Sequence, residues 1–256
     1  MTDALIGSSG FVGTTLQRQH AFDAQFRSTN IDDIRGGRFD VVACAGAPGQ
    51  KWRANQDPAG DRASLERLRD ALAGVRCRRF VLISTVDVFH DPVGVDEDSP
   101  IETQDLSPYG LHRYELEQFV LDAFGAAAII VRLPGLVGPG LRKNLLYDFQ
   151  HANDIGKFDA RSTFQFYPTV NLWPDIGMAL DAGLPLVHLT AAPIAVGAVA
   201  AEVFGRDFNT TFDRAPAAYD MRTRHAAHFG SEGPYQYDRR ASLLAMRAYH
   251  QSEPVA

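Results

Sequence analysis

The chain has 256 residues, of which 45% are hydrophobic and 22% charged, a composition typical of a folded globular protein. Its formal net charge of −6 argues against a nucleic-acid partner, because proteins that bind the phosphate backbone usually carry a basic excess. The apolar runs are too short to span a bilayer, and the first one begins too close to Met1 to leave room for a signal peptide. With Cys44 and Cys77 expected as reduced thiols, these features indicate a cytoplasmic protein without a membrane partner.

Short apolar runs alternate with amphipathic segments along the chain. Runs of this length, bounded by Gly, Pro or polar residues, are typical of strands buried on both faces. The predicted strands are Ala4–Ile6, Ala24–Arg27, Asp40–Ala43, Phe80–Ile83, Ala128–Leu133 and Leu186–Leu189. The predicted helices include Thr14–His20, Asp61–Leu72, Ser107–Phe124 and Ala195–Phe204. Strands that alternate with helices indicate an α/β fold with a doubly wound parallel sheet of the Rossmann type.

Two stretches, 141–168 and 208–256, break this alternation. Ligands bind beyond the carboxyl ends of the strands in open α/β sheets, so insertions there are candidates for a substrate lobe. We expect a dinucleotide-binding core over residues 1–140 and a mixed region over residues 141–256. Within the mixed region, residues 174–206 would complete the sheet, and residues 141–173 and 207–256 would form the small substrate lobe.

A glycine-rich turn follows the first predicted strand. Glycines allow a sharp turn and a close approach of the backbone to a pyrophosphate, whose charge then lies at a helix N-terminus. A tight structural turn is the alternative, but a position between a strand and a helix is the context that dinucleotide binding requires. The residues predicted to contact a dinucleotide here are Gly7, Ser9, Gly10, Phe11, Val12 and Gly13.

The end of the second predicted strand bears on the choice between NAD(H) and NADP(H). A carboxylate there would favour the ribose hydroxyls of NAD, whereas an arginine suits the 2′-phosphate of NADP. The strand ends at Arg27 and Ser28 without a carboxylate, which favours NADP(H), although Arg27 could equally be a solvated strand end. Asp32 and Asp33 come later and are expected to open a helix behind an Asn30 cap.

Small or hydroxyl-bearing residues follow the third and fourth predicted strands. A flat cofactor could lie against the backbone at Ala45, Gly46 and Ala47, although small residues there could also serve close helix packing. Ser84 and Thr85 end the fourth strand and bring hydroxyl groups to the same edge of the sheet.

The helix that begins at Ser107-Pro108 carries a candidate acid–base unit. Tyr109 and Arg113 lie four residues apart on one helical face, which Leu116 continues inward. A core tyrosine beside a snorkelling arginine is the plain structural alternative. A cation on an apolar face is costly unless it is paired, and a fixed cation would lower the pKa of a neighbouring tyrosine by favouring the phenolate.

Four motifs together resemble the extended short-chain dehydrogenases/reductases, also called the NAD-dependent epimerase/dehydratase family. They are the glycine turn, Ser84-Thr85-Val86-Asp87-Val88-Phe89, Ser107-Pro108-Tyr109-Gly110-Leu111-His112-Arg113 and the run Arg132–Gly140. The tail segment Pro185–Leu189 is similar to that of dTDP-4-dehydrorhamnose reductases. The resemblance is strongest over residues 1–140.

The resemblance implies roles for particular residues. Tyr109 would be the general acid/base, Thr85 would hydrogen-bond the same substrate oxygen, and Arg113 would occupy the position of the lysine that binds the nicotinamide ribose. Arginine and lysine are not interchangeable, so this departure bears on turnover. The remaining candidates are Ser84, Pro134, Leu136 and Val137 for the cofactor and Asp87 and Asn144 for the substrate.

Two further departures concern the substrate: Gly135 stands where many relatives have Asn, and Phe89 where they have Tyr. Asn144, with Arg142 and Lys143 beside it, could hold a substrate diphosphate, although a solvated helix start is the simpler interpretation.

Three other patterns are open to structural explanations. His225 and His228 have a spacing that could bind a metal, but a third ligand is not evident, so no metal is expected. Residues 96–98 are interpreted as a solvated acidic loop. The aromatic residues of 164–168 and Trp173 could either wall a sugar or base, or pack in the core.

Two functions follow from these expectations. The first is an NAD(P)-dependent oxidoreductase, a reductase or epimerase acting on a carbonyl or hydroxyl carbon of a nucleotide-linked sugar. The second is a dinucleotide-binding regulatory or carrier protein without turnover, which the arginine at position 113 keeps open. Either would be a monomer or a homodimer.

Overall fold

The computed structural model describes residues 2–253, which divide into two compact units. The first unit contains the segments up to His90, Ser99–Arg132 and Ile176–Val187. The second contains Asp91–Asp98, Leu133–Asp175 and the residues from His188 onward. The expected lobe ranges 141–173 and 207–256 fall in the second unit.

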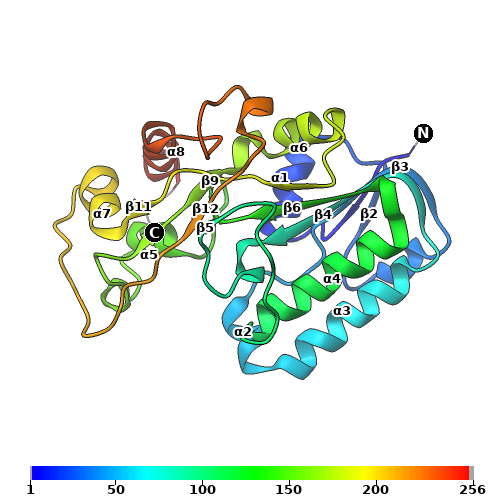
Figure 1. The fold of residues 1–256 in the computed structure, drawn as a ribbon, viewed down its shortest axis with the longest axis horizontal. Coiled ribbons are helices and arrows are strands. Elements are labelled where there is room, and N and C mark those ends of the chain that lie inside the picture. Colours follow the sequence, from blue (N-terminus) through cyan, green and yellow to red (C-terminus); the bar gives the residue numbers. More distant parts are fainter. Residues whose placement is uncertain (1, 254–256) are drawn as a thin grey trace. The chain divides into compact units, whose positions relative to one another are not determined.

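The first unit is built on a parallel sheet. In the described part of the chain this sheet has six strands in the order β10-β6-β4-β3-β1-β2, and β1 pairs in parallel with both β2 and β3 (Figure 1). The strands are β1 (Ala4–Ile6), β2 (Ala24–Phe26), β3 (Arg38–Cys44), β4 (Arg76–Thr85), β6 (Ala128–Leu133) and β10 (Leu186–His188). Every residue of β1 and β6 is buried, as expected for strands covered on both faces. The predicted doubly wound sheet is confirmed.

Helices cover both faces of this sheet. Helices α3 and α4 run side by side on one face, and α1 lies on the other (Figure 1). The helices of this unit are α1 (Phe11–Gln19), α2 (Lys51–Gln56), α3 (Pro58–Leu72), α4 (Pro108–Phe124) and, in part, α6 (Leu172–Asp181). Short 3-10 turns occur at η1 (Ile31–Ile34), η2 (Val86–Val88) and η3 (Gly125–Ala127).

The starts of α3 and α4 follow from local sequence. Asp57 and Ser107 are N-caps whose side chains accept hydrogen bonds from Gly60 N and Gly110 N, and each cap is followed by a proline in the first turn. The Asn30 cap that we expected is wrong, because the Asn30 side chain accepts from Arg27 N and only a 3-10 turn follows it.

The second unit combines short strand pairs with three helices. Strand β7 (Gly135–Val137) pairs in parallel with β9 (Phe166–Pro168), β5 (Val93–Val95) with β12 (Asp220–Met221), and β8 (Thr163–Phe164) pairs antiparallel with β11 (Ile194–Ala195). Its helices are α5 (Leu145–Gln150), α7 (Val196–Phe204) and α8 (Arg239–Ser252), with 3-10 turns at η4 (Ile155–Lys157), η5 (Thr169–Asn171) and η6 (Ala226–Phe229).

The structure bears on the acidic loop of residues 96–98 and on the aromatic residues of 164–168, both in the second unit. Glu97 is not in a merely solvated loop, since it accepts from His188 N, Thr223 Oγ1 and Arg224 N at 2.8, 2.6 and 2.9 Å. Phe166 and Tyr167 are buried, which supports their core role.

The histidine pair expected on a helix lies instead around the 3-10 turn η6. The rings of His225 and His228 are 6.1 Å apart, and residues 2–253 hold no group of three ligands suited to a metal ion.

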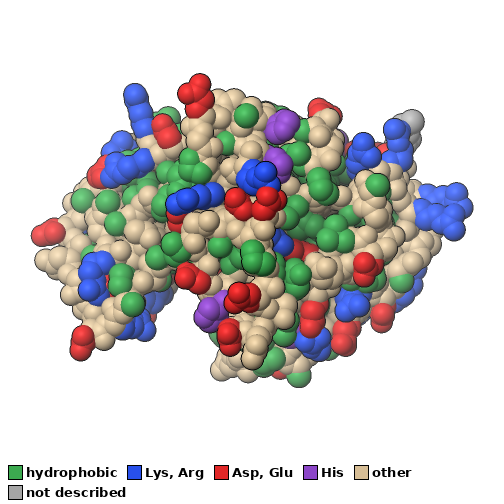
Figure 2. Space-filling view, viewed as in Figure 1, with side chains coloured by type: hydrophobic (Ala, Val, Ile, Leu, Met, Phe, Trp, Pro, Cys, Tyr) green, Lys and Arg blue, Asp and Glu red, His purple; other side chains and the backbone are tan. Residues whose placement is uncertain are grey.

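The surface carries charges of both signs. On the face drawn in Figure 2, basic and acidic side chains of the described residues are interspersed. Within residues 2–253, no helix combines the length and the hydropathy that a membrane crossing needs.

The glycine turn yields a test of the fold. A Cβ on Gly13 would lie 2.1 Å from Gly7 O and 3.0 Å from Ser8 Cα, both rigid backbone atoms, whereas a Cβ on Gly10 would lie 3.4 Å from Gly7 O. We expect Gly13→Ala to cost about 3 kcal/mol of unfolding free energy through overpacking, and Gly10→Ala to change it by less than about 1 kcal/mol. Urea unfolding midpoints measure both variants. Equal urea midpoints for the two variants would contradict the expected overpacking at Gly13.

Candidate active site

The turn after β1 meets the turn after β3 at the point where the strand order reverses. From β1 the chain passes outward to β2 and then back to β3 on the other side of β1. Gly7 has φ +83, and a Cβ there would lie 2.2 Å from Ala45 O. The reversal point in an open α/β sheet is where its ligands bind. Gly7 therefore lets two turns approach at the position expected for a dinucleotide.

This turn also has the features that suit a pyrophosphate. Gly10 is the N-cap residue of α1, and the helix, all of it described, has no acidic side chain in its first turn. The main-chain N–H groups of a helix start are donors for an anion. Ala45, Gly46 and Ala47 supply only small side chains opposite the turn. These residues fit a nicotinamide dinucleotide: the start of α1 would hold its phosphates, and the small residues Ala45, Gly46 and Ala47 would leave room for its flat rings.

Arg27 and Ser28 are exposed directly after β2. The Gly7 N–H donates to Phe26 O at 2.7 Å, so the glycine turn and the end of β2 are joined. The structure brings Arg27 and Ser28 next to the predicted phosphate turn.

Thr85 and Tyr109 form the hydroxyl pair of the site. Thr85 ends β4, Tyr109 lies in the first turn of α4, and the two side chains are hydrogen bonded. Tyr109 is only 8% exposed. The structure therefore brings together the two hydroxyl groups that, by the family resemblance, are expected to act on one oxygen.

Arg113 lies under the ring of Tyr109. Its guanidinium carbon is 3.9 Å from the ring centroid, and the side chain is 3% exposed. This contact is a cation–π interaction with the face of the ring. The predicted proximity of Tyr109 and Arg113 is therefore present in the structure.

The terminal nitrogens of Arg113 form hydrogen bonds within the protein. Nη1 and Nη2 donate to the two carboxylate oxygens of Asp61 at 2.5 and 2.8 Å, and Nη2 also donates to Pro48 O at 2.6 Å. Only Nε lacks a hydrogen-bond partner among the described residues. The contact of Arg113 with the cofactor ribose stays a prediction: Asp61 and Pro48 O occupy its terminal nitrogens, and Nε is the donor that remains.

Asp61 is the residue that sequence reasoning missed. It belongs to the first turn of α3, is 8% exposed, and also accepts a hydrogen bond at 2.8 Å from the ring of His112. A signal was present, since Asp61 shares its helical face with Leu65, Leu68 and Leu72, where a carboxylate needs a partner. Burial raises the pKa of Asp61, but the hydrogen bonds from Arg113 and His112 outweigh burial and hold the pKa below its usual value.

The pKa of Tyr109 differs from our expectation. We expected the adjacent cation to lower it. Burial raises the pKa of Tyr109 above its ordinary value, and the lowering by Arg113 is the smaller effect, with Asp87 adding to the rise. In the protein alone the phenol is therefore the protonated acid at neutral pH.

Ser84 and Asn144 are committed to other contacts. Ser84 Oγ donates to Glu117 Oε1 at 2.5 Å in a buried network with Arg132, and a contact of Ser84 with the cofactor stays a prediction. Asn144 caps α5 by accepting from Leu146 N, and its Nδ2 donates to Leu136 O at 2.8 Å. The interpretation as a helix start accounts for Asn144.

The remaining candidates are placed as follows. Asp87 lies in η2, beside Thr85, and forms an ion pair with Lys51. Pro134, Leu136 and Val137 belong to the second unit, where Val137 is buried in β7.

The sequence matches the model of the NAD dependent epimerase/dehydratase family over residues 25–158, slightly more than half of the chain. The chain belongs to this family, which confirms the resemblance and the class of enzyme, with a nicotinamide dinucleotide as cofactor. No curated protein matches the sequence.

Solved structures with the same fold are similar over nearly the whole chain. A dTDP-4-dehydrorhamnose reductase from Clostridium acetobutylicum ATCC 824 has 17% identity and a TM-score of 0.73, covering 98% of this chain and 99% of that one. The same enzyme from Bacillus anthracis str. Ames, in complex with NADP, has 16% identity and a TM-score of 0.74, covering 98% of each chain. A UDP-glucuronic acid 4-epimerase from Bacillus cereus, in complex with NAD, has 16% identity and a TM-score of 0.70, covering 98% of each chain. At these identities the likeness concerns the fold.

The buried Asp61–Arg113 pair yields a stability prediction. Asp61→Asn would leave the Arg113 cation without its counter-charge, and removal of one partner of a buried pair costs about 3–5 kcal/mol. Denaturant unfolding at pH 7 measures this loss. As a control, Asp61→Leu combined with Arg113→Met removes both charges. This double variant should lose clearly less unfolding free energy than Asp61→Asn does.

The Asp61–Arg113 pair also makes the stability of the folded protein depend on pH. The folded-state pKa of Asp61 lies below the ordinary value of 3.8, so its contribution is fully present above that pH and is lost as the pH falls through the folded-state pKa. The difference in stability between the native protein and Asp61→Asn should therefore narrow in acid. A difference that stays constant to pH 2 would exclude the pair as its source.

Proposed function

We propose that the protein is an NAD(P)-dependent oxidoreductase that acts on a carbonyl or hydroxyl carbon of a nucleotide-linked sugar, as a reductase or an epimerase. The observation that carries this proposal is the hydrogen-bonded pair of Tyr109 and Thr85 at the carboxyl end of β4. Relatives of the same fold are named as dTDP-4-dehydrorhamnose reductases and as a UDP-glucuronic acid 4-epimerase, which supports the substrate class.

The proton chemistry belongs to the chain's own residues. The bound nicotinamide supplies or accepts the hydride. Tyr109 Oη donates a proton to the substrate oxygen when a carbonyl is reduced and accepts one when an alcohol is oxidised. Thr85 Oγ1 holds the same oxygen, which fixes the distance over which the proton moves.

The resting protonation state of the Tyr109 phenol follows from its burial. Burial raises the pKa of Tyr109, so the protein rests with the proton on Oη. A protonated tyrosine is the form that carbonyl reduction needs at its start.

The family's nicotinamide cofactor is proposed to be NADP(H). Arg27 and Ser28 are exposed at the end of β2, beside the glycine turn, where a 2′-phosphate would be recognised. The binding of substrate by residues 141–173 and 207–256 stays a prediction, as does a cytoplasmic location.

A dinucleotide-binding protein without turnover is the second candidate. It is favoured by one observation: the Asp61 carboxylate and Pro48 O occupy the terminal donors of Arg113, which stands in place of the family's lysine. Tight cofactor binding without hydride exchange would identify this function.

Tyr109→Phe tests the acid–base role. We expect kcat to fall about 10²-fold or more, because a general acid contributes at least that factor, with cofactor affinity unchanged within about twofold. Absorbance of the nicotinamide with dTDP- or UDP-linked 4-ketosugars reports kcat, and cofactor fluorescence reports binding. Tyr114→Phe, on the same helix, is the matched control. Survival of native rates in Tyr109→Phe would remove this residue from the mechanism.

Arg27→Ala tests the cofactor preference. Loss of a charge-assisted contact to a 2′-phosphate should raise the KM for NADPH about tenfold and leave the KM for NADH nearly unchanged. Arg38→Ala, which removes a cation from the opposite end of β3, should change neither value. Equal effects of Arg27→Ala on both cofactors would exclude recognition of the 2′-phosphate.

A further inference from the structure

A second cation lies close to the proposed acid–base pair. Lys51 is the first residue of α2, and its Nζ lies 2.7 Å from Asp87 Oδ1. The Lys51 side chain is 46% exposed and Asp87 is 18% exposed. Arg113 is buried and fixed, whereas Lys51 is partly exposed and has a long flexible side chain. Lys51 is therefore the cation that can move.

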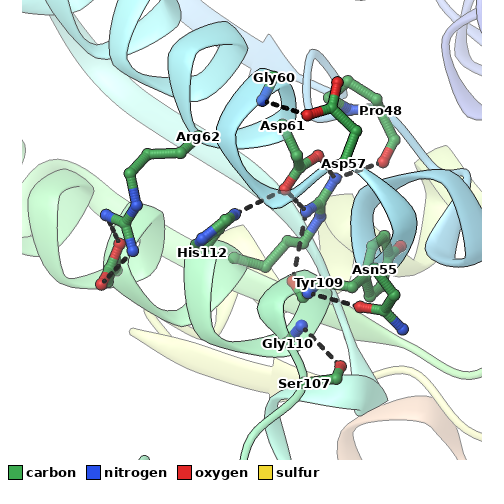
Figure 3. Close-up of polar contacts among 12 residues, drawn as sticks. Pro48, Asn55, Asp57, Gly60, Asp61, Arg62, Ser107, Tyr109, Gly110 and His112 are labelled. Carbon is green, nitrogen blue, oxygen red and sulfur yellow. Dashed lines mark hydrogen bonds and ion pairs between the residues drawn. The ribbon is translucent and has the colours of Figure 1, made fainter.

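Helix α2 is fixed against the turn that carries Tyr109. Asn55 Oδ1 accepts a hydrogen bond from Tyr109 N at 3.0 Å, as Figure 3 shows. Lys51 and Asn55 are four residues apart and share one face of α2. The contact that docks α2 on α4 therefore also directs Lys51 towards the proposed acid–base pair.

The 3-10 turn η2 is pressed against the same turn of α4. A Cβ on Gly110 would lie 2.0 Å from Asp87 O, so the two backbones approach as closely as a glycine allows. Helix α2 and η2 thus both contact the first turn of α4, α2 through the Asn55 side chain and η2 through its backbone.

Asp87 links Lys51 to the hydroxyl pair. Its backbone N–H donates to Thr85 Oγ1 at 3.2 Å, and its Oδ2 accepts from the same hydroxyl at 3.4 Å. Thr85 is in turn hydrogen bonded to Tyr109. An unbroken path of polar contacts runs from Lys51 through Asp87 and Thr85 to the phenol.

We propose that Lys51 is a positioning residue that supplies the mobile positive charge for proton transfer at Tyr109, with Asp87 as its resting partner. The proposal rests on the proposed function of Tyr109. Arg113 stays bound to Asp61 and supports the ring from below. When Oη gives up its proton to the substrate oxygen, Lys51 moves from Asp87 towards the new phenolate and compensates its charge.

The charges around the phenol agree with these separate roles of Arg113 and Lys51. Arg113 from α4 and Lys51 from α2 lower the pKa of Tyr109, as does the hydrogen bond from Thr85, whereas burial and Asp87 raise it. Removal of the Lys51 charge should therefore raise the pKa of Tyr109, and removal of the Asp87 charge should lower it.

The test begins with the protein free of cofactor. Ionisation of Tyr109 is followed by ultraviolet difference titration, using the spectrum of each variant minus that of the same variant with Tyr109→Phe. Lys51→Met should titrate at higher pH than the native protein, and Asp87→Asn at lower pH. Arg53→Met removes an exposed cation two residues away on α2 and should leave the titration unchanged.

Activity gives the second readout. We expect Lys51→Met to lower kcat about tenfold at neutral pH and to move the alkaline rise of alcohol oxidation to higher pH. Lys51→Arg, which keeps the charge, should restore most of kcat. Circular dichroism checks that each variant is folded.

The outcomes separate the two proposals. If Lys51→Met and Arg53→Met both match the native protein in titration and in turnover, the role of Lys51 is overturned while the oxidoreductase stands. If no nucleotide sugar is turned over but the Tyr109 titration still shifts with Lys51→Met, the proposed function fails and the electrostatic role of Lys51 is retained.

Discussion

The candidate site depends on the ion pair between Asp61 of α3 and Arg113 of α4. Removing two charges from water is costly, and this pair offsets the cost with two direct hydrogen bonds and a further bond to Pro48 O. A guanidinium held at both terminal nitrogens is restricted in orientation, and here its central carbon lies 3.9 Å from the centroid of the Tyr109 ring. The pair therefore joins two helices of the same sheet face and fixes the ring of the proposed acid.

A fixed arginine changes how charge is distributed at the site. A lysine is a compact charge on a flexible stem, whereas an arginine bonded as a fork stays in place. With Arg113 bound to Asp61, burial determines the direction of the Tyr109 pKa, and the phenol rests protonated. The proposed mobile role of Lys51 follows from this arrangement, because compensation of a transient phenolate requires a cation that can leave its partner.

The second unit is organised around its own buried polar groups. Gln165 donates to Ala191 O and Met221 O and accepts from Met221 N, which ties three separated segments together. Tyr167 and Tyr237 both donate to Asp175 Oδ2, at 2.5 and 2.9 Å. Long-range side-chain contacts of this kind hold much of residues 141–168 and 208–238, which explains why these stretches show little strand–helix alternation in the sequence.

The alternating strands and helices, the glycine turn and the positions of Thr85 at a strand end and Tyr109 at a helix start could be predicted from the amino-acid sequence. These features depend on short-range periodicity, on cap residues such as Ser107 and on the fixed rule that parallel strands end at one edge. The partner of Arg113 could be identified only in the folded protein. Asp61 is 52 residues away in sequence, and its approach depends on how α3 packs against α4. The net direction of the Tyr109 pKa was decided in the same way, because burial is a property of the packed chain and not of a motif.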